Sequence, residues 1–484
     1  MFFVVFLVIL ASAVSGLAVK WWLDSSRADK EITKTEYWVG VVLISLLVAP
    51  LATKAGWEIA KKNLITFNEY WNGWERNANR NDIQCTRDGP CRYEYDCDPY
   101  LCPYECGGYE GTGKDRHYVS KTCWKTCYHS CPYVKTETNY SVSTTLGDYE
   151  IASHLFPDNP QANRWRDSVD IPQHVIDRAG CGIPPFWAAV KMRVDSGKPG
   201  PVTQRRKYDN YILASDLTIL KQYSDAIDKY RSAGLLSEVR REVYDFYYSD
   251  KVHFVGFSSP GAVQWQVELA YFNAAFGIEL QGDLHLAVVQ NDLINSNPDA
   301  YLLALKAYWQ NPKVFGKDAI SKNSIIMAIG TKDGKTIEWA RAITGMPLGN
   351  EKLTVAVHNR LKGLPLNTKV IFGDRELKAK HASIRKSYLA KRSAANLEGY
   401  PLDEFGVLER IFWGLDESDS RFKRIAMAPD DPGGSGSGFL YLANDIHLTS
   451  GQKAAVFFGS LFVCMLVWLG AALIGERQTS WRRW

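Results

Sequence analysis

Residues 85–131 read CTRDGPCRYEYDCDPYLCPYECGGYEGTGKDRHYVSKTCWKTCYHSC and hold eight of the ten cysteines of this 484-residue chain. Cys102 and Cys106 are four residues apart, and so are successive members of the set Cys123, Cys127 and Cys131. This spacing places each set on one face of a strand. Prolines and glycines punctuate a stretch otherwise rich in Tyr, Thr and Val, a composition that favours strands and turns. The sequence therefore predicts an antiparallel hairpin that turns within Gly107–Asp115.

The predicted hairpin suggests a disulfide pattern. Residues that face each other across an antiparallel hairpin have a constant sum of positions, and the pairs Cys102–Cys127 and Cys106–Cys123 share one sum. The pair Cys97–Cys131 misses that sum by one, which a β-bulge near Asp98 would absorb, and Cys85–Cys91 then remains. Many other connectivities are open to eight cysteines, so this pairing is a hypothesis.

Zinc is the competing interpretation of these cysteines. Zinc motifs commonly use two cysteines separated by two residues, whereas at least three residues separate neighbouring cysteines here. Disulfides also suit a small module with few Leu and Ile, which needs covalent staples to hold a fold. We therefore expect residues 57–150 to form a disulfide-rich β module in an oxidising compartment.

Three apolar segments lie outside this module. The runs Met1–Val19, Tyr37–Thr53 and Ala454–Gly475 contain no charged side chain, and about 17 to 25 apolar residues suffice to cross a bilayer. Trp and Tyr residues flank the runs, as expected where a helix leaves the hydrocarbon. The sequence predicts three transmembrane helices, at residues 1–19, 37–56 and 454–475.

The basic residues next to these segments predict their orientation. Lys and Arg concentrate in the short connection 20–36 and in the tail 476–484, and such residues favour the cytoplasmic side. The N-terminus and the long segment between the second and third helices are then expected outside the cytoplasm, where cysteines can oxidise. The alternative is that Met1–Val19 is a cleaved signal peptide, but it lacks a basic n-region. The basic residues are Lys20, Arg27, Lys30, Lys34, Arg477, Arg482 and Arg483.

The remaining extracytoplasmic chain divides by its patterns. Residues 151–250 predict a helical segment, with a helix over Phe186–Val194 and another opened by Ser215-Asp216. Cys181 in this segment has no obvious partner and is interpreted as a free thiol. Residues 371–453 predict a basic helix over Lys378–Arg392 and a β hairpin, of Phe422–Ala428 with Phe439–Ala443, that returns the chain to the membrane. A solvated face explains the basic helix, and contact with lipid headgroups or an acidic partner is the alternative.

Residues 251–370 have the pattern of an α/β domain. Val263–Phe276 predicts a helix ended by Gly277, and Asn297-Pro298-Asp299 is a helix start with an N-cap and a proline in the first turn. Asn350 is expected to cap a last helix. Strands are predicted at Leu284–Val289, at Ser324–Gly330 and, after a hairpin turn at Lys332–Lys335, at Thr336–Ile343.

This segment resembles the TPM domain family, also called TPM phosphatases. The resemblance covers about a quarter of the chain and rests on four features. They are Ala304–Trp309 followed by Gly316, the apolar strand Ser324–Ile329, the hairpin after it, and Gly345–Leu353 before the final helix. The resemblance implies a membrane-anchored, extracytoplasmic α/β sandwich. Some members are acid phosphatases or bind calcium, and others help to assemble or maintain membrane complexes.

The family resemblance also directs attention to the acidic residues. Members of the family place an acidic residue before the central strand, where this chain has Lys322, and a lysine there would weaken a calcium site, because calcium is held by oxygen ligands. Asp299 and Asp318 are candidate metal ligands, and a cap or turn role is the alternative for each. The same alternatives apply to Asp283 and Asp333. Lys322 and Arg341 could supply positive charge to a phosphoryl group.

The sequence as a whole predicts a membrane-anchored α+β protein that acts as an extracytoplasmic scaffold or interaction protein in an envelope membrane complex. An acid phosphatase or calcium-dependent hydrolase on the TPM-like domain is the first alternative, and a cell-surface receptor is the second. The expected partners are the lipid bilayer, other envelope membrane proteins and, in an oligomer, further copies of the chain. The net charge of +4 is dispersed, so nucleic acid is not an expected partner. No cofactor is expected apart from calcium.

Overall fold

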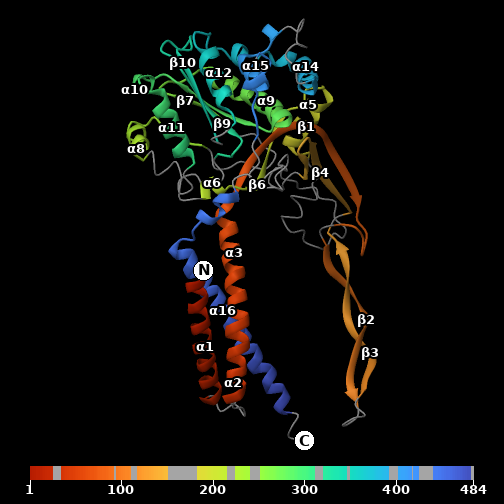
Figure 1. Ribbon diagram of the computed structural model, residues 1–484. Helices are drawn as coiled ribbons and strands as arrows, with labels where there is room; N and C mark the ends of the chain where they lie inside the picture. The colour runs from red at the N-terminus through yellow and green to blue at the C-terminus, as the bar shows by residue number, and fades with distance from the viewer. Residues whose placement is uncertain are drawn as a thin grey trace.

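The chain is a mixed α+β protein in which three long apolar helices support a larger body and a projecting hairpin (Figure 1). The computed structural model describes residues 1–25, 34–91, 94–110, 117–133, 135–150, 183–214, 224–239, 251–310, 320–345, 349–391, 402–416, 418–424 and 440–480. Its strands form two four-stranded sheets and a separate two-stranded hairpin.

Three helices are long and apolar enough to cross a membrane, with candidate spans at Phe2–Trp22, Tyr37–Ile65 and Ser450–Gly470. The second helix extends past residue 56, where we expected it to end, and its last turns stand between the apolar span and the body. A π-helical stretch directly precedes Pro50, which suits a residue that cannot donate its own backbone hydrogen bond. The elements are α1 (Phe2–Ser25), α2 (Lys34–Gly40), η1 (Val41–Val48), α3 (Ala49–Ile65) and α16 (Ser450–Ser480).

The three apolar helices pack against one another through small residues. A Cβ added at Gly16 would lie 2.5 Å from the ring of Trp468, and one at Gly40 would lie 2.6 Å from the same ring. The hydroxyl of Ser45 donates to that of Ser12 at 3.2 Å. Such close approach is typical of helix association in lipid, where van der Waals packing and hydrogen bonds replace the hydrophobic effect.

Helix α3 passes into strand β1 (Thr66–Gln84) without an intervening loop. The Thr66 hydroxyl donates to the Lys62 carbonyl at 2.7 Å, and the Lys62 ammonium lies 2.6 Å from the Asp209 carboxylate. The backbone N–H of Asn210 donates to the carbonyl of Ile65 at 2.7 Å. The joint between the apolar helix and the body is therefore held from both sides.

The long strand β1 belongs to both the body and the cysteine module. Its first half pairs antiparallel with β6 (Pro201–Asp209), and its second half pairs with β4 (Thr136–Thr144), which also pairs with β5 (Gly147–Glu150). The sequence predicted only helices between 151 and 250, so β6 is a correction. The predicted helix in that segment is α5 (Pro185–Asp195), and α6 (Tyr211–Ala214) and α8 (Ser224–Ser232) follow β6. Ser215-Asp216 lies outside the described residues.

The body is built around a sheet with the order β10-β9-β8-β7, in which β7, β8 and β9 are parallel and β10 is antiparallel. Every residue of β8 and β9 is buried, as expected for strands covered on both faces. The predicted strands therefore form, and β7 is an addition that the sequence did not predict. The strands are β7 (Val252–Val255), β8 (Asp283–Val289), β9 (Ser324–Gly330) and β10 (Trp339–Thr344).

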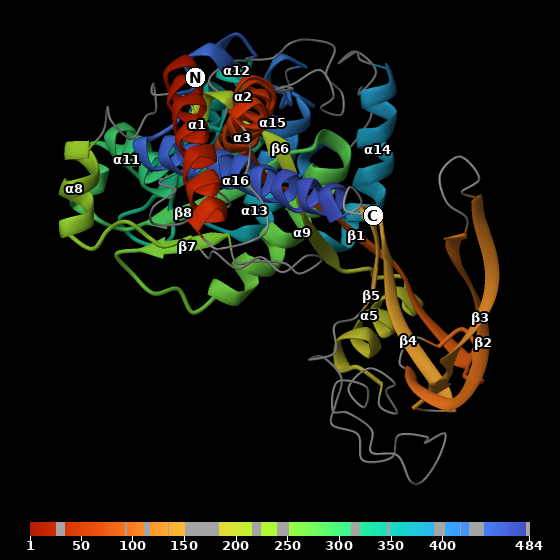
Figure 2. The same ribbon diagram turned by 90° about the horizontal axis from the view of Figure 1, so that it is seen from below.

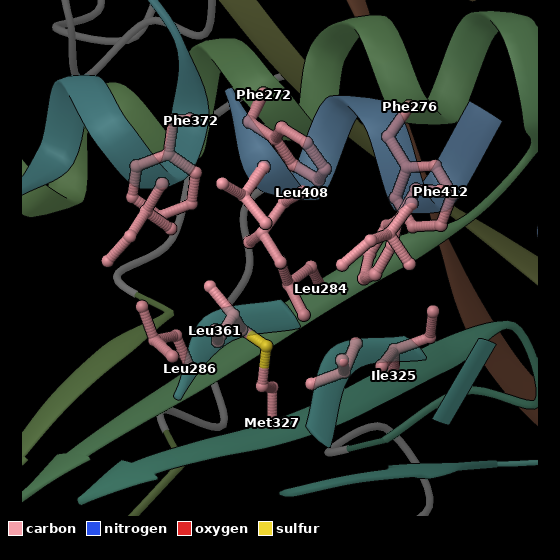
Figure 3. Packing of buried hydrophobic residues seen from close by; sticks show 14 of the residues in the cluster. Phe272, Phe276, Leu284, Leu286, Ile325, Met327, Leu361, Phe372, Leu408 and Phe412 are labelled. Carbon is pink, nitrogen blue, oxygen red and sulfur yellow. The ribbon is translucent and has the colours of Figure 1, made fainter. Parts of the chain in front are cut away.

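Helices cover both faces of this sheet. On one face, Phe272 and Phe276 lie with Phe412 over the sheet residues Leu284 and Met327 in the main hydrophobic cluster (Figure 3). On the other face, helices α8, α10 and α11 pack around buried aromatic side chains. The helices are α9 (Ala262–Leu280), α10 (Asp292–Asn295), α11 (Pro298–Trp309), α12 (Glu351–Leu361), α13 (Thr368–Phe372), α14 (Lys378–Lys391) and α15 (Val407–Trp413).

One predicted helix start is confirmed, and two other helix ends differ from the prediction. Asn297 caps α11 through its side chain as predicted. Asn350 occupies the N-cap position of α12, but its side chain exchanges hydrogen bonds with the backbone of Lys423 and does not cap the helix. Helix α9 does not end at Gly277. It continues to Leu280, and Gln281 takes the left-handed conformation at φ 58°.

Gly277 lies where α9 touches β1, and we expect its replacement by Ala to destabilise the body. A Cβ there would lie 2.5 Å from the carbonyl oxygen of Asn72, so one backbone must move, at a typical cost of about 1–3 kcal/mol. Gly459→Ala is the matched control, because a Cβ at that helical glycine meets nothing within 4 Å. Chemical unfolding of the two variants should separate them, and equal stability would contradict the proposed close contact.

The return towards α16 is helical and not the predicted hairpin. Residues Leu440–Asp445 form a 3₁₀ helix, so the predicted strand at Phe439–Ala443 is wrong. The predicted basic helix is α14, but its face is only partly solvated, because Arg385 is 1 % exposed. Residues 425–439, which contain the rest of the predicted hairpin, lie outside the described residues.

Candidate functional site: a disulfide-stapled arm

A two-stranded hairpin projects from the body as a separate arm, formed by β2 (Glu94–Glu110) and β3 (His117–Pro132). Its cysteines form Cys97–Cys131, Cys102–Cys127 and Cys106–Cys123, and Cys85–Cys91 closes a loop at its base. The Cα atoms of each pair are 5.4–5.8 Å apart, within the usual range for disulfides. These are the four pairs that the sequence predicts.

The register of the arm differs from the predicted one by two residues. Cys102 lies opposite Lys125 and Cys106 lies opposite Lys121, so each disulfide runs diagonally to the next cysteine on the same face. The cysteine spacing still identifies the correct partners, because in each arm disulfide the cysteine of β3 lies two positions after the residue directly opposite its partner on β2. A register shift between Cys97 and Pro99 supplies the predicted bulge.

The loop closed by Cys85–Cys91 fixes the base of the arm. The Asp88 carboxylate accepts a hydrogen bond from the Ser130 N–H at 2.8 Å and lies 2.6 Å from the His129 ring. These contacts lower the pKa of Asp88 below its ordinary value, with the Ser130 N–H as the main cause. Arg87 adds an ion pair with Asp98 at 3.4 Å. These contacts bind the loop to both strands of the arm and hold the base of the arm together.

The two faces of the arm differ in chemistry. Opposed residues of an antiparallel pair share a face, and successive residues alternate. We call the first face the disulfide face; it holds the six arm cysteines together with Tyr100, Tyr104, Lys121, Lys125 and His129. We call the second the apolar face; beyond the bulge its described side chains are Pro99, Leu101, Pro103, Glu105, Tyr118, Ser120, Thr122, Trp124, Thr126 and Tyr128. At the base of the arm, before the bulge, this face also holds Glu94, Asp96, Ser130 and Pro132.

A buried polar cluster lies where β1 meets β8. Asp283 forms an ion pair with Lys251, and both side chains are almost fully buried. The same carboxylate lies 3.0 Å from His285 Nε2 and accepts a hydrogen bond from Asn72 at 2.9 Å. Burial alone would raise the pKa of Asp283, but the charge of Lys251, followed by that of His285, lowers it well below its ordinary value. This cluster joins β1, β7 and β8, and sequence reasoning missed it.

The charges expected to serve a phosphoryl group are engaged elsewhere. The Lys322 ammonium is buried 3.9 Å from Glu69 and 5.0 Å above the Tyr208 ring, and burial lowers the pKa of Lys322 to about 8. Arg341 donates from Nε to the Asp299 carboxylate at 2.8 Å. Each cation thus has its own carboxylate partner.

The predicted metal ligands do not form an oxygen cage in the described part of the chain. Asp299 is exposed and pairs with Arg341, and Asp318 lies outside the described residues. Asp333 is a turn residue, which was the alternative to its role as a metal ligand. Hydrogen bonds from the backbone N–H groups of Lys335 and Thr336 lower the pKa of Asp333 to about 2. Asp283, in contrast, is neither a cap nor a turn residue.

The cysteines close enough to acidic residues to bind a metal ion with them are already in disulfides. Two such groups occur among the described residues; one contains the disulfide Cys85–Cys91 and the other contains Cys97–Cys131. Cys464 is a free thiol buried between the apolar helices, and Cys181 lies outside the described residues. Within the described chain, the arm is therefore the feature with the clearest capacity for function, as a contact surface.

Comparison of the chain with known protein families, with curated proteins and with solved structures finds no match.

Proposed function

We propose that this protein is a membrane-anchored, extracytoplasmic scaffold that contributes to an envelope membrane complex. The observation that carries the proposal is the arm, a rigid surface that lies beyond the hydrophobic core of the body. Tyr100 and Tyr104 are exposed on the disulfide face of the arm, and Tyr is among the residue types that contribute most to binding energy. The resemblance of residues 251–370 to the TPM domain family, in which some members help to assemble membrane complexes, supports the same proposal.

The anchoring supports the same proposal. Apolar segments near both termini pack together, so that the body is tethered to one place on the membrane at its beginning and its end. Basic residues in 20–36 and 476–484 favour a cytoplasmic location for both connections. The four cysteine pairs favour an oxidising location for the body and the arm.

The sidedness is tested with the full-length chain in intact cells. In a Cys181→Ser background, which removes the predicted free thiol on the same side, a reductant and a maleimide that cannot cross membranes should together label the eight cysteines of 85–131, and the maleimide alone should not. Thr35→Cys, in the predicted cytoplasmic connection, is the matched control and should react only with a permeant maleimide. Cysteines 85–131 that are already reduced, and that only the permeant reagent reaches, would remove the basis of the proposal.

The scaffold role is tested by the size of the assembly. We expect the chain solubilised in mild detergent to migrate in a complex larger than its own 54.6 kDa with bound detergent. Lys125→Glu on the disulfide face should weaken that complex, whereas Lys352→Glu on α12 should not. Migration as a monomer under all mild conditions would contradict the scaffold role.

A phosphatase or calcium-dependent hydrolase remains the alternative proposal, and a cell-surface receptor is the other. Turnover of phosphate esters by the full-length chain, with and without calcium, distinguishes the first alternative from a scaffold. Activity that disappears in Asp299→Asn or Asp318→Asn would favour the enzyme.

A further inference from the structure

The apolar face of the arm is open along its length. Leu101 is 67 % exposed, Trp124 62 %, Tyr128 55 % and Tyr118 51 %, whereas large apolar side chains of a folded domain are mostly buried. The ring of Tyr118 occupies the space over Gly107, where a Cβ would lie 2.3 Å from it. Leu101, Trp124 and Tyr128 lie in successive pairs with Thr126, Pro103 and Pro99 and form an apolar strip, while Tyr118 lies nearer the tip, beyond Glu105 and Ser120.

Beyond the bulge at Cys97–Pro99 the same face carries little charge. Its one acidic or basic group among the described side chains there is Glu105, which accepts a hydrogen bond from the Ser120 hydroxyl at 2.6 Å; Glu94 and Asp96 lie on this face only at the base of the arm. The lysines of the arm, Lys121 and Lys125, are on the disulfide face. The arm is therefore amphipathic across its two faces, with Trp, Tyr and Leu on one and cations on the other.

The position of the arm indicates what covers this strip. The arm and the three apolar helices leave the same side of the body, and the arm runs alongside them (Figure 1). The view from below shows the arm displaced sideways from the helices (Figure 2). As drawn, the arm extends beside the helices over much of their length, so lipid is what the arm meets when those helices are in a bilayer. Trp and Tyr are also the side chains enriched at the boundary between lipid and water.

The depth of the arm is limited by its backbone. Both strands have one unpaired edge, and open strand edges do not occur in contact with the hydrocarbon, where no water satisfies them. An arm about 56 Å long, from 17 residues of β2 at about 3.3 Å each, therefore has to swing about its base, away from the direction in Figure 1, to lie along the headgroup region, where water reaches its edges.

We propose that the apolar face of the arm lies in the interface of the protein's own membrane, with Leu101 and Trp124 in the headgroup and acyl boundary and the disulfide face turned to the aqueous side. This inference rests on the sidedness proposed above. It deepens the scaffold proposal, because it leaves the disulfide face for protein partners.

The test uses the full-length chain in nanodiscs of phosphatidylcholine with brominated acyl chains. A fluorescent amino acid sensitive to its environment replaces Thr126 on the apolar face, opposite Leu101, or the neighbouring Lys125 on the disulfide face. These adjacent positions lie at the same distance along the arm and differ only in face. Mapping of the four disulfides in each variant establishes that the arm has formed.

We expect the probe at 126 to be quenched several-fold more than the probe at 125, and to emit at shorter wavelength. Trp124→Ser with Leu101→Ser should reduce that quenching towards the value at 125. Equal quenching at both positions, or none at 126, would overturn the proposal. So would a probe at 126 that is shielded only in native membranes, because the strip would then be a protein contact. The labelling in cells tests sidedness independently, so the two failures are distinguishable.

Discussion

Replacing Lys251 by Met should cost about 3–5 kcal/mol of stability at neutral pH, because it leaves the carboxylate of Asp283 buried without its cation. The pH dependence should also change sign. In the native chain the pKa of Asp283 is depressed, so its contribution is complete above about pH 4 and is lost as the pH falls below that value. In Lys251→Met the dominant effect is burial, which raises the pKa of Asp283. The folded state then takes up a proton more readily than the unfolded state, and stability falls as the pH rises.

Unfolding of the full-length chain by denaturant at pH 4 and pH 7 measures both effects. Lys191→Met is the matched control, because its ion pair with Asp195 is exposed and should contribute less than about 1 kcal/mol. Adding Asp283→Asn to Lys251→Met should recover stability at pH 7 and flatten the pH dependence. A Lys251→Met variant that is no more stable at pH 4 than at pH 7 would show that the ion pair does not hold the cluster together.

The second large effect is expected at Arg385, the buried cation of helix α14. Its guanidinium donates to Glu279 at 2.8 and 3.0 Å and to Glu409 at 2.6 Å, and it lies 4.7 Å above the Trp413 ring. Arg385→Met removes the charge shared by two carboxylates, of which Glu409 is buried, at an expected cost of about 3–5 kcal/mol. Arg385→Lys should recover only part of this loss, since an ammonium cannot form the two-pronged contact with Glu279.

The control for Arg385 lies on the same helix. Lys380 pairs with Glu404 at 2.8 Å but is half exposed, so Lys380→Met should cost less than about 1 kcal/mol. Midpoints of unfolding of the three variants, followed by tryptophan fluorescence, give the order of stability. If Arg385→Met and Lys380→Met were equally stable, α14 would not depend on this network to remain on the body.

The parts of the fold that the sequence predicts are those with local signals. The positions of the arm cysteines identify their partners, because a hairpin joins residues near in sequence. The N-cap and proline at Asn297-Pro298 identify the start of α11, and the apolar runs of β8 and β9 reflect burial on both faces. Composition likewise identifies the three apolar helices.

The parts that the sequence does not predict depend on distant contacts. Strand β6 is polar at most positions, and it is a strand because β1, more than 120 residues earlier, pairs with it. Gly277 has the appearance of a helix end, whereas its small size is needed for contact with Asn72. The Asp283 cluster collects residues from three separate segments, and a charged residue is ordinarily expected at the surface. No local pattern distinguishes a buried charge from an exposed one.

Because no loop separates α3 from β1, we expect a change in the direction of the second apolar helix to move the body with it. This helix has 29 residues from Tyr37 to Ile65, or about 43 Å, which exceeds the hydrocarbon thickness of about 30 Å. Tilting is governed by the charge-free part of the helix, Tyr37–Thr53, which is about 26 Å long, so we expect the helix to tilt where the hydrocarbon is thinner than this. With Lys62 and Ile65 fastened to Asp209 and Asn210, we expect such a tilt to rotate the body and the arm with it, so that lipid thickness sets the angle at which the molecule meets its neighbours.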